Sequence, residues 1–135
     1  MKRIFLDTNF IIDYFIREEF QAPADYLLTY GKSQGVIFYI SYLTLANFAY
    51  ILRKQPKEQL FQILGKCIKL FQVIDNNVYQ VTQAIKLTPK DFEDALQYQA
   101  ALEGGCNCII TRNSKDFSFA KIPVYSPDEF ISLYL

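Results

Sequence analysis

The chain has 135 residues, 51% of them hydrophobic and 16% aromatic, and its 14 basic residues balance 14 acidic ones. This composition favours a single globular domain over residues 1–135 with a substantial core, and the balanced charge gives no general footprint of nucleic-acid binding. Histidine is absent from the sequence, which excludes His-based acid–base catalysis and His-ligated zinc.

The three cysteines, Cys67, Cys106 and Cys108, are an odd number and match neither a disulfide framework nor a zinc knuckle. We expect free, buried thiols in a reducing cytosol, so the predicted location is cytoplasmic. Asp7 and Asp13 interrupt the apolar N-terminal run, which argues against a signal peptide and against a membrane span.

Short apolar runs alternate with longer amphipathic segments along the whole chain. The first half predicts a strand at residues 4–6, helices at 10–16 and 24–32, a strand at 36–40, helices at 42–54 and 56–70, and a strand at 71–74. The second half predicts helices at 75–87 and 92–103, strands at 108–110 and 124–125, and a final helix at 127–135.

Strands that are apolar throughout and alternate with helices are typical of a parallel sheet covered on both faces. The predicted fold is therefore α/β: a three-layer α/β/α sandwich with a central parallel sheet of four to five strands. Right-handed crossovers would place the carboxyl ends of all strands at one edge, where such sheets bind ligands.

Asp7 lies at that edge, directly after the first predicted strand and before the helix-start residues Thr8 and Asn9. One interpretation is a local helix cap, because helix starts favour such side chains. The other is a functional carboxylate, and the choice depends on whether further acidic residues converge on Asp7.

Two further aspartates are candidates for that convergence. Asp94 lies near the start of the helix predicted at 92–103, where capping and the helix dipole also favour acidic residues. Asp116 follows the strand predicted at 108–110 in a polar loop, where aspartates often form turns. Three carboxylates that meet would repel one another, and Mg²⁺ or Mn²⁺ with its preference for oxygen ligands would relieve the repulsion. The chemistry that fits best is metal-assisted hydrolysis of a phosphodiester.

Asn47 lies inside the helix predicted at 42–54. A buried amide needs hydrogen-bond partners, so one interpretation is a structural bond to a neighbouring loop or strand end. The other is a neutral oxygen ligand near the metal. The residues alone leave both open.

Four segments together resemble the PIN domain family of metal-dependent ribonucleases, and the resemblance covers nearly the whole chain. The segments are Phe5-Leu6-Asp7-Thr8-Asn9, Ser41-Tyr42-Leu43-Thr44-Leu45-Ala46-Asn47, Asp91-Phe92-Glu93-Asp94-Ala95 and Ile110-Thr111-Arg112-Asn113-Ser114-Lys115-Asp116-Phe117. The family fold is an α/β/α sandwich with a parallel sheet, in agreement with the alternation of elements. Many small bacterial members are VapC-type toxins whose antitoxin covers the active site.

The resemblance implies a catalytic and metal-binding role for the aspartates and a substrate-facing role for their neighbours. The implied catalytic set is Asp7, Asp94, Asp116 and Asn113. Asp7, Asp94 and Asp116 would hold the metal with Asn47 as a further candidate ligand, and Thr8, Asn9, Arg112 and Lys115 would face substrate. For Arg112 and Lys115 the alternative is ordinary solvated surface charge. Asn47 departs from the resemblance, because toxin members typically have glutamate there.

Two functions follow from these observations. The first is an Mg²⁺- or Mn²⁺-dependent endoribonuclease that cleaves RNA, the toxin of a toxin–antitoxin pair. The alternative is a PIN-like module that binds RNA or protein with weak or no nuclease activity, because Asn47 removes one carboxylate.

Expected partners are RNA and an antitoxin protein, with no membrane. Most of the helix aromatics should be core, and a few left exposed would form a dimer or partner surface. The residues concerned are Tyr26, Tyr30, Phe48, Tyr50, Phe61 and Tyr98. A homodimer is expected from the resemblance alone.

Overall fold

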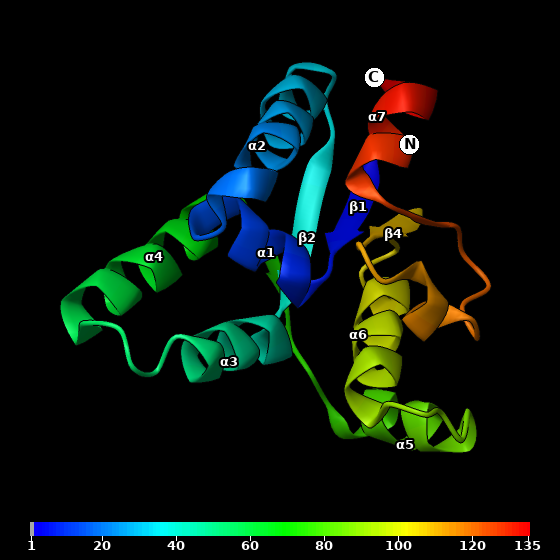
Figure 1. Ribbon diagram of the computed structural model, residues 1–135. Coiled ribbons are helices and arrows are strands. Elements are labelled where there is room, and N and C mark those ends of the chain that lie inside the picture. Colours follow the sequence, from blue (N-terminus) through cyan, green and yellow to red (C-terminus); the bar gives the residue numbers. More distant parts are fainter. Residues whose placement is uncertain (1) are drawn as a thin grey trace.

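The computed structural model describes residues 2–135, in which five parallel strands form one sheet. The order is β3-β2-β1-β4-β5, so the first strand lies at the centre of the sheet (Figure 1). The strands are β1 (Arg3–Leu6), β2 (Ile37–Ser41), β3 (Gln72–Ile74), β4 (Cys108–Ile110) and β5 (Val124–Tyr125). The predicted parallel sheet of four to five strands is confirmed.

Helices cover both faces of this sheet, and the side chains of β1 show why. Ile4 and Leu6 pack into a core with Phe10 of the first helix, whereas Phe5 points to the opposite face and packs with Tyr98. Successive strand residues point to opposite faces, so a fully apolar strand needs a helical layer on each side. The predicted three-layer sandwich is therefore present.

The helices follow the predicted order, with different ends. They are α1 (Thr8–Phe15), α2 (Glu18–Ser33), α3 (Tyr42–Ile51), α4 (Lys57–Leu70), α5 (Val78–Lys86), α6 (Phe92–Glu103) and α7 (Pro127–Tyr134), with a short 3₁₀ helix, η1 (Ser114–Phe117). In Figure 1, α1 and α2 lie beside β2, whereas α5 packs against α6 at the other end of the molecule.

Three predicted helix boundaries were wrong by three residues or more, and the others differ by at most two residues. The second helix begins at Glu18 and not at residue 24, because its two acidic residues occupy the first turn, where the helix dipole favours them. The third helix ends at Ile51, so Arg53 and Lys54 lie beyond its last turn. The fifth helix begins after Asn77, whose side chain accepts from the backbone N–H of Gln80, and not at Asp75.

The prediction for the cysteines is confirmed, because all three are free and buried. The prediction that most of the named aromatics are core was wrong. Phe48 and Tyr98 are buried, but four others are exposed by 39–66%: Tyr26, Tyr30, Tyr50 and Phe61. Within residues 2–135 we find no helix long and apolar enough to cross a membrane.

Several helices begin at the carboxyl edge of the sheet, each with a polar cap. Asp7 caps α1, Ser41 caps α3 in a capping box with Thr44, and Asp91 caps α6. η1 begins after Asn113, just beyond the end of β4. The fold therefore gathers helix starts, and the side chains of their first turns, around the end of the central strand.

Candidate metal centre

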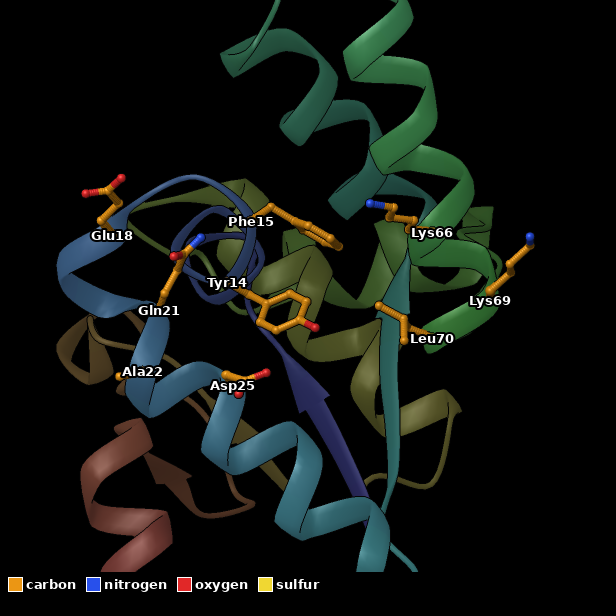
Figure 2. A pocket seen from close by; sticks show the side chains of 9 residues that line it. All are labelled: Tyr14, Phe15, Glu18, Gln21, Ala22, Asp25, Lys66, Lys69 and Leu70. Atoms are coloured by element: carbon orange, nitrogen blue, oxygen red, sulfur yellow. The ribbon is translucent and has the colours of Figure 1, made fainter.

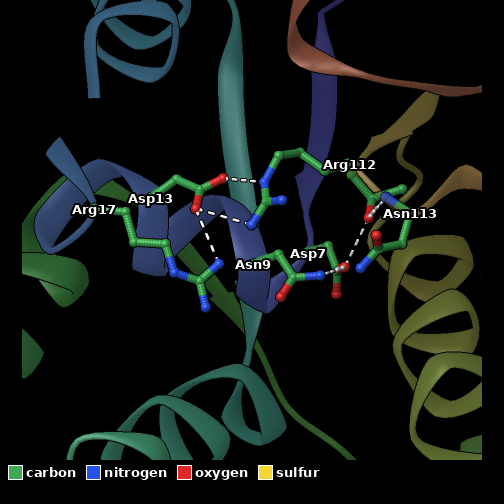
Figure 3. A network of polar contacts seen from close by, with 7 residues as sticks. Asp7, Asn9, Asp13, Arg17, Arg112 and Asn113 are labelled. Atoms are coloured by element: carbon green, nitrogen blue, oxygen red, sulfur yellow. Dashed lines mark hydrogen bonds and ion pairs between the residues drawn. The ribbon is translucent and has the colours of Figure 1, made fainter. Parts of the chain in front are cut away.

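Asp7 is buried at the end of β1 and held by neutral hydrogen-bond donors. Its Oδ1 accepts from the backbone N–H of Thr8 at 2.8 Å, and its Oδ2 accepts from the Thr111 hydroxyl at 2.8 Å and the Asn9 amide at 3.4 Å (Figure 3). Burial raises the pKa of the Asp7 carboxyl above its ordinary value, although the bonds from Thr111 and Thr8 oppose the shift. Asp7 is a helix cap, and it is also a carboxylate fixed in place.

The negative charges of Asp94 and Asp116 act on the same region. Burial is the largest cause, and together with the charges of Asp7, Asp91 and Asp116 it raises the pKa of Asp94 to about 7. The charge of Asp116, from η1, also raises the pKa of Asp7. The three aspartates named from the sequence are therefore electrostatically coupled across α1, α6 and η1.

A fourth carboxylate, which sequence reasoning did not single out, belongs to this group. Partial burial raises the pKa of Glu93, and the charges of Asp91 and Asp7 add to the shift. Glu93 directly precedes Asp94 in the first turn of α6. The signal was present in the sequence as three acids within four residues, more than capping requires.

Asn47 contacts this fourth carboxylate. Its amide Nδ2 donates a hydrogen bond to Glu93 Oε1, a contact that joins α3 to the start of α6. Of the two interpretations that the sequence left open, the structural hydrogen bond is present, with a glutamate as its partner.

A buried polar network lies beneath the acidic residues and joins three helix starts. Gln97 of α6 accepts from the Ser41 hydroxyl at 2.7 Å and donates to Thr44 at 3.1 Å and to Thr8 at 3.3 Å. These side chains are fully or almost fully buried. Thr8, predicted to face substrate, is therefore a support for the Asp7 loop, and Asn9 is hydrogen-bonded to Asp7 itself.

The loop after β4 places the remaining predicted residues. Asn113 is exposed, its backbone N–H donates to Thr111 Oγ1 at 3.0 Å, and its side chain points toward Asp7 in Figure 3. Lys115 is exposed on η1, one residue before Asp116. Both positions are open to a ligand at the carboxyl edge.

Arg112 has a different environment from the one its predicted substrate role suggests. Its guanidinium pairs with Asp13 through Nε at 2.6 Å and Nη2 at 3.2 Å, and it lies 4.2 Å above the Phe20 ring. Arg17 adds a second ion pair to Asp13 at 3.4 Å (Figure 3). In the part of the chain that the structure describes, both ion pairs thus go to Asp13.

The donor set at Asp7 fits a hard divalent cation. As the side chains are placed, no three acidic or cysteine side chains within residues 2–135 converge closely enough to enclose an ion by themselves. An open arrangement suits Mg²⁺, which keeps several of its waters when it binds to protein carboxylates. Burial and the repulsion from neighbouring carboxylates together raise the pKa of Asp94, and such a cation would offset the repulsion.

A cavity of about 850 Å³ has none of these carboxylates in its lining. It is bounded by α1, α2 and α4, with Glu18 and Asp25 on one side and Lys66 and Lys69 on the other (Figure 2). Tyr14, Phe15 and Leu70 contribute apolar surface to it. Its acidic and basic side chains face each other, so it is distinct from the group of aspartates around Asp7.

A parallel α/β/α sandwich with carboxylates at its carboxyl edge defines a class of proteins that bind ligands where the strands end. Within that class the chain belongs to the PIN domain family, because the sequence model described as "PIN domain" matches residues 3–115. The resemblance drawn from the four segments is confirmed.

Individual relatives agree with this assignment. The chain is similar to Ribonuclease VapC1 of Aquifex aeolicus (strain VF5), with 27% identity over 138 residues, 96% of this chain and 93% of the relative. Its fold matches VapBC-1 from nontypeable Haemophilus influenzae, with 19% identity and a TM-score of 0.72 over 93% of this chain and 98% of that one. It also matches a toxin–antitoxin complex from Klebsiella pneumoniae, with 24% identity and a TM-score of 0.69 over 92% and 97%. At these identities the solved structures establish the shared fold.

Proposed function

We propose that this protein is a divalent-metal-dependent endoribonuclease that hydrolyses phosphodiester bonds in RNA. The observation that carries the proposal is the coupling of Asp7, Asp94 and Asp116 at the carboxyl edge of the sheet, where burial of Asp94, together with the charges of its acidic neighbours, raises the pKa of Asp94 to about 7. Uncompensated carboxylates of this kind are typical of metal sites that act on phosphate esters. The similarity to a ribonuclease named VapC1 supports RNA as the substrate.

In this proposal Asp7, Asp94 and Asp116 hold Mg²⁺ or Mn²⁺, and their neighbours position them. A divalent ion bound there would lower the pKa of a water molecule and neutralise charge on the scissile phosphate. Thr111 and the backbone N–H of Thr8 fix the Asp7 carboxylate through bonds of 2.8 Å.

The groups beyond the carboxylates have proposed roles toward water and RNA. Asn113 would orient the attacking water from its exposed position beside Asp7. Lys115, exposed on η1, would contact a backbone phosphate of the RNA. Arg112 would stabilise the Asp13 region and assist only indirectly, because its guanidinium is paired with Asp13.

We further propose that the protein is the toxin of a toxin–antitoxin pair, with an antitoxin protein as partner. The solved proteins that share its fold include VapBC complexes from Haemophilus influenzae and Rickettsia felis, the latter bound to a promoter DNA fragment. The homodimer and the cytoplasmic location stay predictions. The alternative, a binding module without nuclease activity, rested on the amide of Asn47. That amide donates a hydrogen bond to Glu93 and so has a structural role.

The proposal is tested by incubating single-stranded RNA with the protein in Mn²⁺, in EDTA, and with the variant Asp7→Asn. The variant keeps the size of the side chain and a helix-capping oxygen, so it should fold. We expect cleavage in Mn²⁺, none in EDTA, and at least a 100-fold slower rate for Asp7→Asn, because even residues that only support metal ligands cost about 10–100-fold. Cleavage by Asp7→Asn at the wild-type rate would refute the proposal.

A further inference from the structure

We propose that the end of α3 and the loop that follows it bind single-stranded RNA and hold it beside the aspartates. This surface, the α3 platform, consists of Tyr50, Arg53, Lys54 and Lys57. It lies at the end of α3 and in the connection to α4 (Figure 1). The inference rests on the proposed function for RNA as the substrate, and it adds the surface that holds the RNA for cleavage.

The platform concentrates positive charge in a chain that has no net charge. Residues 42–57 contain three basic residues, Arg53, Lys54 and Lys57, and no acidic one, whereas the whole chain has 14 of each kind. All three residues are exposed. Among the described residues 2–135 both ion pairs involve Asp13, so none is formed by these three cations. Uncompensated surface cations are complementary to the phosphates of a nucleic acid.

The helix dipoles account for only part of this charge. Arg53 and Lys54 follow the end of α3, where the dipole favours cations. Lys57, in contrast, is the first residue of α4, where the dipole disfavours a cation. The feature that all three cations share is their position on one exposed connection between two helices.

An exposed aromatic ring lies beside the cations. Tyr50 is 66% exposed, and the guanidinium of Arg53 lies over its ring, 4.1 Å from the ring centroid. The same guanidinium donates a hydrogen bond to the backbone carbonyl of Tyr50 at 2.9 Å, which fixes the pair on the surface. Unpaired bases stack on tyrosine rings and arginine planes, and nearby lysines then contact the backbone phosphates.

The platform is connected to the carboxyl edge of the sheet through α3. Gln97 donates hydrogen bonds to Thr44 near the start of α3 and to Thr8 at the start of α1. Thr8 directly follows Asp7 in the sequence. Tyr50 follows Thr44 by six residues, about 9 Å along the helix axis. RNA held on the platform is therefore close to the proposed site of cleavage.

A protein partner is the other candidate for this surface. An apolar protein contact would tolerate Tyr50→Leu, whereas stacking of a base needs a planar ring. A second copy of this chain fits poorly, because a two-fold contact centred on the platform would bring its cations against the same cations. The charge and the ring together favour RNA.

The first experiment measures binding of a fluorescein-labelled single-stranded RNA to the full chain by fluorescence anisotropy in EDTA. We expect Tyr50→Leu to bind at least about fivefold more weakly than wild type, because a base loses its stacking partner. Tyr50→Phe keeps the ring and should stay within about twofold of wild type. The control is Tyr79→Leu, because Tyr79 of α5 is 68% exposed and should not affect binding.

The salt dependence of binding tests the cations. The platform variant replaces them with glutamine: Arg53→Gln/Lys54→Gln/Lys57→Gln. The control makes the same change of charge at three exposed lysines elsewhere: Lys32→Gln/Lys69→Gln/Lys86→Gln. The slope of log K against log salt changes by about 0.7 for each phosphate contact to a single strand. We therefore expect the slope to be shallower by about 2 for the platform variant and by less than about 0.5 for the control.

The outcomes separate this inference from the proposed function. If Tyr50→Leu and the platform variant bind RNA like wild type, or if wild type binds none, the platform is refuted, and cleavage in Mn²⁺ would still support the nuclease. If both variants lose RNA binding but wild type does not cleave RNA in Mn²⁺, the nuclease is refuted and the platform stands. Unchanged RNA binding together with an altered oligomeric state on gel filtration would assign the surface to a protein contact instead. Thermal melting checks that each variant is folded.

Discussion

Two aspartates near the start of the chain, Asp7 and Asp13, are almost equally buried but have opposite surroundings. Asp7 is 6% exposed and Asp13 is 2% exposed. Asp13 is paired with two arginines, Arg17 and Arg112. Asp7 receives hydrogen bonds from neutral donors, and the charges that act on it come from other carboxylates.

The difference shows how this fold treats a buried charge. The carboxylate of Asp13, which has a structural role, is neutralised by arginine side chains of the same chain. One of them, Arg112, lies 99 residues away in the sequence. At Asp7 burial, together with the charges of Asp116 and Asp91, raises the pKa and so makes ionisation harder. Under the proposed function, the coupled aspartates would receive their positive charge from a bound divalent cation and not from a side chain of the protein.

The largest expected effect tests the structural side of this comparison. Asp13→Asn removes the charge that both arginines share, and we expect the free energy of unfolding to fall by about 2–4 kcal/mol. Loss of one partner from a fully buried pair costs about 3–5 kcal/mol, and the value here is lower because both arginines are partly exposed and can reach water. Urea denaturation at pH 7 measures the change.

Asp25→Asn on α2 is the matched control, because Asp25 is exposed and its substitution should change stability by less than about 0.5 kcal/mol. In the same samples, Mn²⁺ affinity should be unchanged by Asp13→Asn. If Asp13→Asn instead lost Mn²⁺ binding but kept its stability, the roles that we assign to Asp7 and Asp13 would be reversed.

The fold could be predicted from the sequence because its central elements are fixed by local chemistry. The fully apolar run Ile4-Phe5-Leu6 fits only a strand covered on both faces, and the alternation of strands with helices leaves a parallel sheet. The predicted helix boundaries were wrong where tertiary contacts or capping hydrogen bonds determine where a helix begins or ends. The sequence does not show that the side chain of Asn77, and not that of Asp75, accepts from the free backbone N–H of Gln80 at the start of α5.

The candidate site was predictable in part. Asp7, Asp94 and Asp116 were found because strand ends and helix starts share one edge, and their coupling agrees with that reasoning. Gln97 and the Arg112–Asp13 pair were missed, because contacts across 89 and 99 residues leave no local pattern. The available signal for Gln97 was a polar residue between the apolar residues Leu96 and Tyr98.

The next effect in size tests the neutral support beneath Asp7. Gln97→Met keeps the side-chain volume but removes the partners of Ser41, Thr44 and Thr8. We expect a loss of about 1–3 kcal/mol in the free energy of unfolding, because buried hydroxyls lose a hydrogen-bond partner. Gln99→Met on the same helix is only half-buried and should change stability by less than about 0.5 kcal/mol. Equal losses in the two variants would show that the network contributes nothing beyond packing.

The smallest effect concerns pH and the carboxylate of Asp94. Its pKa rises from 3.8 to about 7 on folding, so the folded state prefers the protonated form. The corresponding stability is complete below pH 3.8 and is lost as the pH rises toward 7 and above. Asp94→Asn removes this penalty and should stabilise the metal-free protein above pH 7.

Because Asp94 is only half-buried, solvent screening limits the gain to about 1 kcal/mol. For a chain of this size that raises Tm by about 3 °C, measured by thermal melting in EDTA at pH 8. The gain should shrink as the pH falls from 7 and vanish well below pH 3.8, where both states of wild type hold the proton. Mn²⁺ must reverse the order at pH 8, stabilising wild type and leaving Asp94→Asn unchanged, because a bound metal competes with the proton on Asp94. If Asp94→Asn is instead less stable than wild type in EDTA at pH 8, Asp94 resembles Asp13, a carboxylate that the fold already compensates.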